Sequence, residues 1–227
     1  MELVERENEI TNILRKIENM EFILVGGYAV SSLTTHRFSV DCDLVVSKSP
    51  KFLRAIKALL KQEGYTSLTK RKDFDAVYGG EFENYIKKIN KLHVSVDLMI
   101  NALVSRDTNA SWSYEYIKKH SIKAGIGAVT CNVPEKELLV AMKIHAGRKA
   151  DIRDVIMLRE GCDPDKTLEH LKRGDIELLK AKLDAILKAF DDEKLIDSLK
   201  GAFRLKQSVE KDIGAAKKFM EKIMTGL

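Results

Sequence analysis

The chain has 227 residues, of which 44% are hydrophobic and 32% charged. This length and composition predict a globular protein with a full hydrophobic core, in one large domain or two small ones, and exclude a disordered chain or a disulfide-stapled mini-protein. The formal net charge of +5 fits an anionic partner such as a nucleotide or RNA, but it is too small to identify one.

The first half of the chain mixes helical and strand patterns. Apolar residues recur at helical spacing within 3–20, a helix is expected from Tyr28 onward, and Pro50 opens an amphipathic helix that ends near Gly64. Short apolar or alternating runs predict strands at 22–25, 40–46, 92–100, 121–124 and 128–133. The segment 65–80 is expected to be a strand or a hairpin.

From Pro134 onward every long segment has helical periodicity. The expected helices cover 135–147 and 151–160, begin at Asp163-Pro164, cover 176–190, and include the tail around Lys217. The predicted fold class is therefore α/β (α+β): a small mixed-sheet domain over residues 1–133, followed by a C-terminal helical bundle over residues 134–227.

Two acids share one face of the strand predicted at 40–46. Asp41 and Asp43 are two residues apart, so both side chains point the same way, roughly 6–7 Å from each other. Asp97 lies in the apolar strand 92–100, where an unpaired acid is costly. If the two strands are neighbours, the three carboxylates form a cluster that would bind Mg²⁺ through oxygen ligands. An Asp-x-Asp pair alone more often belongs to a loop or an exposed strand face.

Gly26-Gly27 lies between the strand at 22–25 and the following helix. Glycines at this position let a phosphate approach the backbone, where the free N–H groups of the first helical turn bind it. The alternative interpretation is a tight turn between a strand and a helix, without a ligand.

These segments together resemble a known enzyme superfamily. Residues 22–46, FILVGGYAVSSLTTHRFSVDCDLVV, resemble motif I of the DNA polymerase beta-like nucleotidyltransferases, and VSVDLMI at 94–100 resembles the motif that supplies their third acid. The helical stretch 137–158 and the R-x-S-x-D-x-D run from Arg37 resemble the AbiEii-type branch of abortive-infection and toxin–antitoxin nucleotidyltransferases. The sequence departs from that branch at Ala150, where a lysine is expected.

The resemblance implies a role for each matching residue. Asp41, Asp43 and Asp97 would be the catalytic residues and the ligands of Mg²⁺ or Mn²⁺, and Asp97 could also accept the proton of the acceptor hydroxyl. The glycines would cradle the terminal phosphates, and a lysine of the helical part would contact the triphosphate. The residues that the resemblance assigns to nucleotide binding are Gly26, Gly27, Lys143, Arg148 and Asp154.

Three further polar residues have structural interpretations. Arg37 is expected to orient the acids through a salt bridge, and His93 and His145 are expected to be hydrogen-bonded structural histidines. Lys143 has an alternative of its own, as a solvated helix residue.

The implied reaction moves a nucleoside monophosphate from a nucleoside triphosphate (NTP) to an acceptor hydroxyl, with pyrophosphate as the leaving group. The toxin–antitoxin resemblance favours RNA, such as a tRNA 3′ end, or protein as the acceptor, and a toxin component with a cognate antitoxin. Three alternatives are an antibiotic-type adenylyltransferase with a small-molecule acceptor, a catalytically silent nucleotide- or RNA-binding module, and a helical scaffold in which the acids meet by coincidence.

The location of the protein is predicted from what the sequence lacks. The acidic N-terminal segment has no apolar core typical of a signal peptide, and no apolar run has the roughly 20 residues that a transmembrane helix needs. The three cysteines, Cys42, Cys131 and Cys162, are far apart and suggest reduced thiols rather than disulfides or a zinc site. We therefore expect a cytoplasmic protein without a membrane partner.

Overall fold

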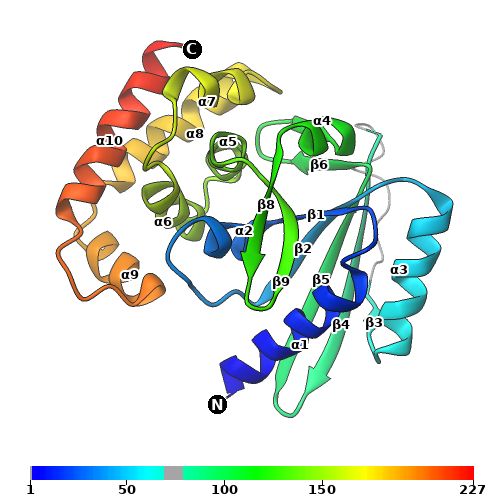
Figure 1. The fold of residues 1–227 in the computed structure, drawn as a ribbon. Coiled ribbons are helices and arrows are strands. Elements are labelled where there is room, and N and C mark those ends of the chain that lie inside the picture. Colours follow the sequence, from blue (N-terminus) through cyan, green and yellow to red (C-terminus); the bar gives the residue numbers. More distant parts are fainter. Residues whose placement is uncertain (1, 69–78) are drawn as a thin grey trace. The chain divides into compact units, whose positions relative to one another are not determined.

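A computed structural model describes residues 2–68 and 79–227 of the chain (Figure 1). The contacts between Cα atoms divide the chain into two compact units. The first unit comprises the described residues of Met1–Ser32, Phe38–Val104 and Trp112–Pro134, and the second comprises Leu33–Arg37, Ser105–Ser111 and Glu135–Leu227. Two short segments therefore belong to the second unit although their sequence neighbours belong to the first.

The first unit is built on a five-stranded mixed sheet with the strand order β1-β2-β5-β4-β3. Strands β2 and β5 run parallel to each other, whereas the other neighbouring strands are antiparallel. Cys42, Leu44, Val96 and Leu98 share one face of β2 and β5 and are fully buried, which explains the apolar residues at alternate positions of these strands. The strands are β1 (Phe22–Val25), β2 (Asp41–Val46), β3 (Thr66–Ser67), β4 (Glu81–Ile89) and β5 (Leu92–Ile100).

Helices and two hairpins complete this part of the chain (Figure 1). The first helix packs against β5 and the last strand, β9. Its fully buried side chains, Ile10, Ile13, Leu14 and Ile17, follow helical spacing. The remaining elements are α1 (Glu2–Ile17), α2 (Gly26–Leu33), α3 (Pro50–Gln62), β6 (Ala102–Ser105), β7 (Ala110–Ser113), α4 (Tyr114–Lys119), β8 (Ser121–Ile126) and β9 (Val129–Pro134).

The second unit is a bundle of helices around α5. This helix packs against α6, α7 and α8, and its residues 138–145 are all buried. A helix buried on every side presents apolar residues on every side, and the two polar side chains buried in this one, Lys143 and His145, need polar partners. The helices are α5 (Lys136–Ala146), α6 (Lys149–Leu158), α7 (Pro164–Leu171), α8 (Ile176–Ala189), α9 (Lys194–Phe203) and α10 (Glu210–Thr225).

The predicted fold class, a mixed α/β part followed by a helical bundle, is confirmed. The prediction omitted β4, β6, β7 and α4, and the domain boundary between residues 133 and 134 stays a prediction. Of the strand or hairpin expected at 65–80, residues 69–78 lie outside the described residues, and β3 covers only Thr66–Ser67.

The structure also describes the cysteines and the hydrophobicity of the helices. The cysteines are free thiols, with Cys42 and Cys131 buried and Cys162 partly so. Within residues 2–68 and 79–227, no helix combines the length and the hydrophobicity that a membrane span requires.

Candidate active site

Three acidic side chains share one face of the central sheet. The parallel pairing of β2 with β5 sets Asp43 opposite Asp97, and Asp41 opposite Ser95. Because side chains alternate between the faces of a strand, Asp41, Asp43 and Asp97 all project from the same face. The neighbourhood of the two strands, which the sequence could only assume, is thus confirmed. On the opposite face, the neighbouring side chains are fully buried: Cys42, Leu44, Val96 and Leu98.

Neutral donors hold two of the three carboxylates. The Ser95 hydroxyl donates to Oδ1 of Asp41 over 2.5 Å, and the Asn84 amide donates to Oδ1 of Asp97 over 2.5 Å. Burial raises the pKa of Asp97; the Asn84 hydrogen bond opposes this effect, and the Asp41 charge adds to it. The sequence prediction missed Asn84 because it contained no strand at 81–89.

The third carboxylate lies against a glycine. Gly26 begins α2 directly after β1 and has a φ of +63°, in the left-handed region that favours glycine. A Cβ atom at this position would lie 1.8 Å from Oδ2 of Asp43, so no larger residue fits without a shift. Gly27 follows in the first helical turn and is buried. The close approach of Asp43 is therefore a structural reason for glycine at position 26.

The charge of this face fits a cation. Among residues 2–68 and 79–227, neither Asp41 nor Asp97 forms an ion pair, and the donors that hold them are uncharged. Carboxylate oxygens are the ligands that Mg²⁺ and Mn²⁺ prefer, and a bound cation would relieve the mutual repulsion of the acids. The residues present therefore suit a divalent metal ion.

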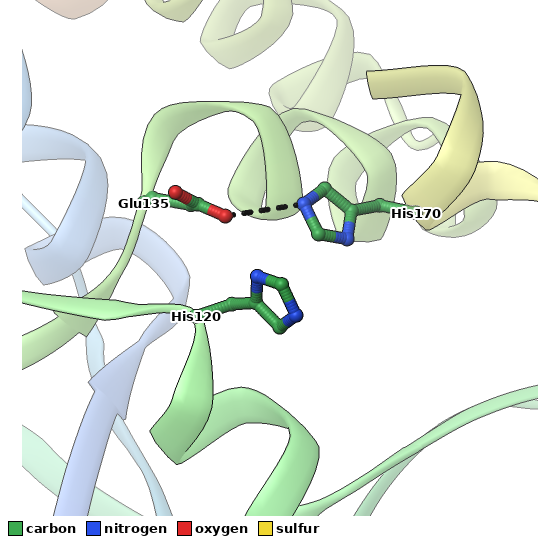
Figure 2. Close-up of side chains that lie close together, drawn as sticks. All are labelled: His120, Glu135 and His170. Carbon is green, nitrogen blue, oxygen red and sulfur yellow. Dashed lines mark hydrogen bonds and ion pairs between the residues drawn. The ribbon is translucent and has the colours of Figure 1, made fainter. Parts of the chain in front are cut away.

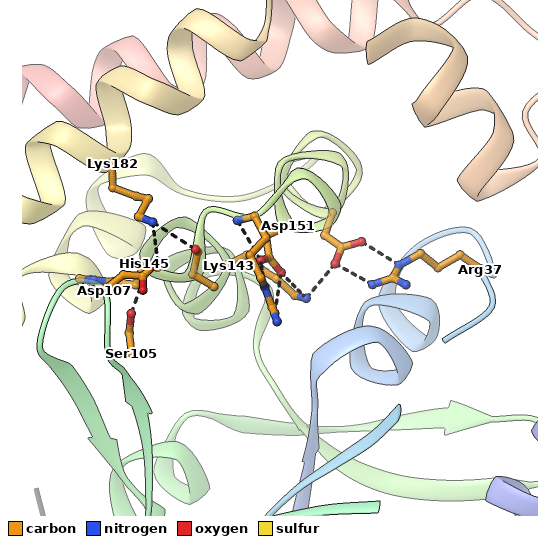
Figure 3. Close-up of polar contacts among 10 residues, drawn as sticks. Arg37, Ser105, Asp107, Lys143, His145, Asp151 and Lys182 are labelled. Carbon is orange, nitrogen blue, oxygen red and sulfur yellow. Dashed lines mark hydrogen bonds and ion pairs between the residues drawn. The ribbon is translucent and has the colours of Figure 1, made fainter. Parts of the chain in front are cut away.

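A second group of charges lies in the helical unit around Lys143 (Figure 3). The buried Nζ of Lys143 lies 2.9 Å from Oδ1 of Asp151 and 2.8 Å from Oδ2 of Asp154. Burial alone would lower the pKa of Lys143, but the two carboxylates outweigh it and raise this pKa. Likewise, burial would raise the pKa of Asp151, but Lys143 and Arg148 lower it.

Two arginines complete this charge cluster, which we define as Arg37, Lys143, Arg148, Asp151 and Asp154. Nη2 of Arg37 donates to Oδ2 of Asp154 over 2.7 Å, and its Nε lies 2.7 Å from Oδ1. Nε of Arg148 donates to Oδ2 of Asp151 over 2.7 Å, from a side chain that is 75% exposed. The sequence suggested that Arg37 orients the acids of the sheet through a salt bridge; in the structure Arg37 forms a salt bridge with Asp154.

Comparison with known proteins identifies the family. The family model described as "Nucleotidyl transferase AbiEii toxin, Type IV TA system" matches residues 12–224. The chain belongs to the AbiEii family. It is accordingly a nucleotidyltransferase of a toxin–antitoxin family, as the motifs around Asp41 and Lys143 predicted.

Solved structures agree with the fold of this AbiEii-family chain. A candidate nucleotidyltransferase from Helicobacter pylori is 15% identical with a TM-score of 0.55, and the match covers 100% of this chain and 96% of that one. JHP933 from Helicobacter pylori is 16% identical with a TM-score of 0.51, over 100% and 94% of the two chains. At such identities the likeness shows the fold alone. No curated protein sequence matches the chain.

Two histidines of this AbiEii-family chain, His93 and His145, were expected to have structural roles. His145 is fully buried, with Nδ1 2.7 Å from the Thr108 hydroxyl and Nε2 3.0 Å from the Leu171 carbonyl oxygen. Burial lowers its pKa from 6.5 to about 4, so the ring is neutral, and the expected structural role of His145 is confirmed. His93 is exposed on β5.

A further buried histidine pairs with an acid in the helical unit. Nε2 of His170 lies 3.2 Å from Oε1 of Glu135 (Figure 2), and Lys166 contacts the other oxygen of the same carboxylate. No sequence pattern indicated this pair, since Glu135 and His170 are 35 residues apart.

Proposed function

We propose that this AbiEii-family protein is a metal-dependent toxin that moves a nucleoside monophosphate from an NTP to a hydroxyl of RNA or protein in the cytoplasm, and that a cognate antitoxin opposes it. The observation that carries the proposal is the row of three acids on one face of β2 and β5, in which Asp43 is the register partner of Asp97 and Asp41 lies two residues before Asp43. Two of the three are held by neutral donors, which leaves their charge available to a cation.

Asp41, Asp43 and Asp97 would hold one or two Mg²⁺ or Mn²⁺ ions. Such ions neutralise the charge that the triphosphate develops during transfer and hold it in position. The acids contribute a rigid arrangement, because adjacent central strands fix their backbone positions. Gly26 lets Asp43 approach the start of α2, where the N–H groups of the first turn are suited to phosphate oxygens.

The reaction itself needs little covalent chemistry from the protein. The acceptor oxygen forms a bond to the α-phosphorus, and the bond from that phosphorus to the oxygen of the β-phosphate breaks. Pyrophosphate leaves with the electron pair, and the proton of the acceptor hydroxyl passes to Asp97. We assign this proton to Asp97 because it is the acid on the strand next to the Asp-x-Asp pair.

The charge cluster suggests how the helical unit contributes to nucleotide binding. An ammonium group has three donors, and two of those on Lys143 face Asp151 and Asp154. Its third donor is the one that we assign to the triphosphate. Arg148 is a second candidate because its side chain is largely exposed. Asp154 is buried against Arg37 and Lys143, so we propose that it acts on the nucleotide through Lys143.

The experiment is a label-transfer assay with separate acceptors. The purified protein receives each α-³²P-labelled NTP with Mg²⁺ or Mn²⁺, and either tRNA, total protein or a mixture of small hydroxyl compounds. We expect label in RNA or protein, and none with Asp43→Ala or with EDTA.

Each outcome discriminates between functions. Label confined to small molecules would replace the toxin function by an antibiotic-type adenylyltransferase. If the wild type binds an NTP with Mg²⁺ but transfers no label to any acceptor, the chain is a nucleotide-binding module. Equal transfer with and without EDTA would contradict the metal dependence.

A further inference from the structure

We propose that Asn84 is a positioning residue that determines which oxygen of Asp97 is offered to a divalent cation. The inference rests on the proposed function and extends it to a residue that contacts neither the cation nor the nucleotide in that proposal. It starts from the hydrogen bond in which Nδ2 of Asn84 donates to Oδ1 of Asp97 over 2.5 Å.

The sheet fixes this contact. Asn84 is the register partner of Asp97 across the antiparallel pair β4 and β5, and Asp43 is the partner of Asp97 on the other side. Val25 of β1 pairs in turn with Asp43, so a line of register partners crosses the four strands β1, β2, β5 and β4. The backbone positions of Asn84 and Asp97 are thus set by ladder hydrogen bonds on both sides of β5, and the amide does not depend on a mobile loop.

The chemistry of Asn84 suits a carboxylate that must keep its charge. A lysine or arginine here would orient Asp97, but it would also neutralise Asp97 and compete with a metal ion. An amide orients the carboxylate without cancelling its charge. The adjacent acid on β4, Glu83, is instead neutralised by a cation. It pairs with Lys57 over 2.7 Å and accepts a hydrogen bond from Tyr85 over 2.9 Å.

Asp41 is held in the same manner. The Ser95 hydroxyl, likewise a neutral donor, contacts Oδ1 of Asp41 over 2.5 Å. Ser95 precedes Asp97 by two residues on β5, so the Ser-x-Asp sequence places a donor opposite Asp41 and an acid opposite Asp43. Asp41 and Asp97 therefore each have Oδ1 engaged by a neutral donor, and among residues 2–68 and 79–227 no side chain donates to Oδ2 of either acid.

This arrangement has a consequence for metal choice. A carboxylate with one oxygen engaged binds a cation through the other oxygen alone, which suits the near-ideal octahedral geometry of Mg²⁺. Calcium accepts bidentate carboxylates and more ligands. Loss of the Asn84 amide frees both oxygens of Asp97, and we expect Mg²⁺ affinity to fall while Ca²⁺ affinity is retained.

The test measures metal binding to the full chain without nucleotide. Bound Mn²⁺ is followed by electron paramagnetic resonance and displaced by Mg²⁺ or Ca²⁺, for the wild type, Asn84→Ala and Asn84→Thr. Threonine favours strands and its hydroxyl is too short to replace the amide, so it tests the same contact if the alanine variant folds poorly. Tyr85→Phe is the matched control, because it removes one side-chain hydrogen bond from the same strand.

We expect the dissociation constant of Mg²⁺ to rise about tenfold or more in both Asn84 variants, as for other residues that orient metal ligands, and that of Ca²⁺ to change less than about threefold. Tyr85→Phe should leave both constants unchanged. An unchanged ratio of Mg²⁺ to Ca²⁺ affinity in the Asn84 variants, with metal binding intact in the wild type, overturns the role of Asn84 alone. No Mn²⁺ binding by the wild type overturns the proposed metal dependence as well.

Discussion

The acid row on the sheet (Asp41, Asp43 and Asp97) and the charge cluster of the helical unit treat carboxylates in opposite ways. In the cluster, Asp151 and Asp154 are paired with Lys143 and with one arginine each. In the row, Asp41 and Asp97 are held by a hydroxyl and an amide. The chain thus pairs Asp151 and Asp154 with cationic side chains, but holds Asp41 and Asp97 with neutral donors.

The difference separates two physical roles. A buried carboxylate that is fully paired with cations has its charge satisfied within the fold, and its removal leaves those cations uncompensated. Acids that share a face with neutral partners keep an unbalanced negative field, which costs stability and attracts metal ions. We therefore expect substitutions in the row to affect activity, and substitutions in the cluster to affect stability first.

The largest effect should follow from Asp43→Asn. We expect nucleotidyl transfer to fall by more than about a hundredfold, since even residues that only orient metal ligands cost 10–100-fold. Asparagine has nearly the size and shape of aspartate, so we expect the variant to fold and to melt cooperatively. The label-transfer assay and a thermal melt measure the two effects. Glu83→Gln, which changes an acid paired with Lys57, is the control and should keep its transfer activity. Undiminished transfer by Asp43→Asn would remove the row from the site.

In the cluster, Asp154→Ala should lower the free energy of unfolding by roughly 3–5 kcal/mol, as expected when one partner of a buried ion pair is removed. Arg37 and Lys143 would both lose a carboxylate at 2.7–2.8 Å. Urea denaturation measures the change. Asp191→Ala, at an exposed pair with Lys217, is the comparison and should cost about 1 kcal/mol or less. A loss in Asp154→Ala no greater than in Asp191→Ala would contradict the structural role of the cluster.

The buried histidine of the helical unit predicts a pH dependence. The pKa of His145 is 6.5 in its ordinary state and about 4 in the fold, so the unfolded chain binds the proton first as pH falls. The stability gained from the neutral ring is complete above pH 6.5 and is lost as pH falls toward 4, by about 2 kcal/mol between pH 7 and pH 5. Unfolding curves of the wild type and His145→Gln across this range isolate the effect. Parallel pH profiles for the two proteins would show that His145 does not titrate as described.

For Gly26→Ala we expect a loss of stability together with a loss of transfer. A left-handed backbone costs a residue with a Cβ roughly 1–2 kcal/mol. The new methyl group would also displace the Asp43 carboxylate, so transfer should fall although every acid remains. Gly125→Ala is the control, since a Cβ there meets no atom within 4 Å. Normal transfer in Gly26→Ala would mean that the close approach to Asp43 has no catalytic consequence.

The sequence predicted the acid row because its signal is local. Asp41 and Asp43 alternate with buried apolar residues on one short strand, and Asp97 does the same on another, so period-two patterning indicated which face each acid shares, whereas the pairing of the two strands had to be assumed. The helices of the C-terminal half could likewise be predicted from apolar spacing and from Pro164 at the start of α7.

Other parts of the site depend on contacts that a pattern cannot reveal. Arg37 and Asp154 are 117 residues apart, and nothing near either one indicates the other. Asn84 was missed because β4 carries charged residues on both sides of its buried Tyr85, and because the turn to β5 uses Asn90 with a φ of +54° rather than a glycine. Gly26 was interpreted as a phosphate-binding glycine or as part of a tight turn, since its contact with Asp43 requires the fold of the sheet.

The central claim is that the acid row binds divalent metal ions that hold an NTP. The most direct measurement is a crystal structure of the protein with Mn²⁺ and a non-hydrolysable ATP analogue, using the anomalous scattering of manganese. We predict one or two manganese peaks, roughly 2.0–2.2 Å from oxygens of Asp41, Asp43 and Asp97 and in contact with the phosphates. A bound analogue whose phosphates and metal ions lie away from these three carboxylates would contradict the account.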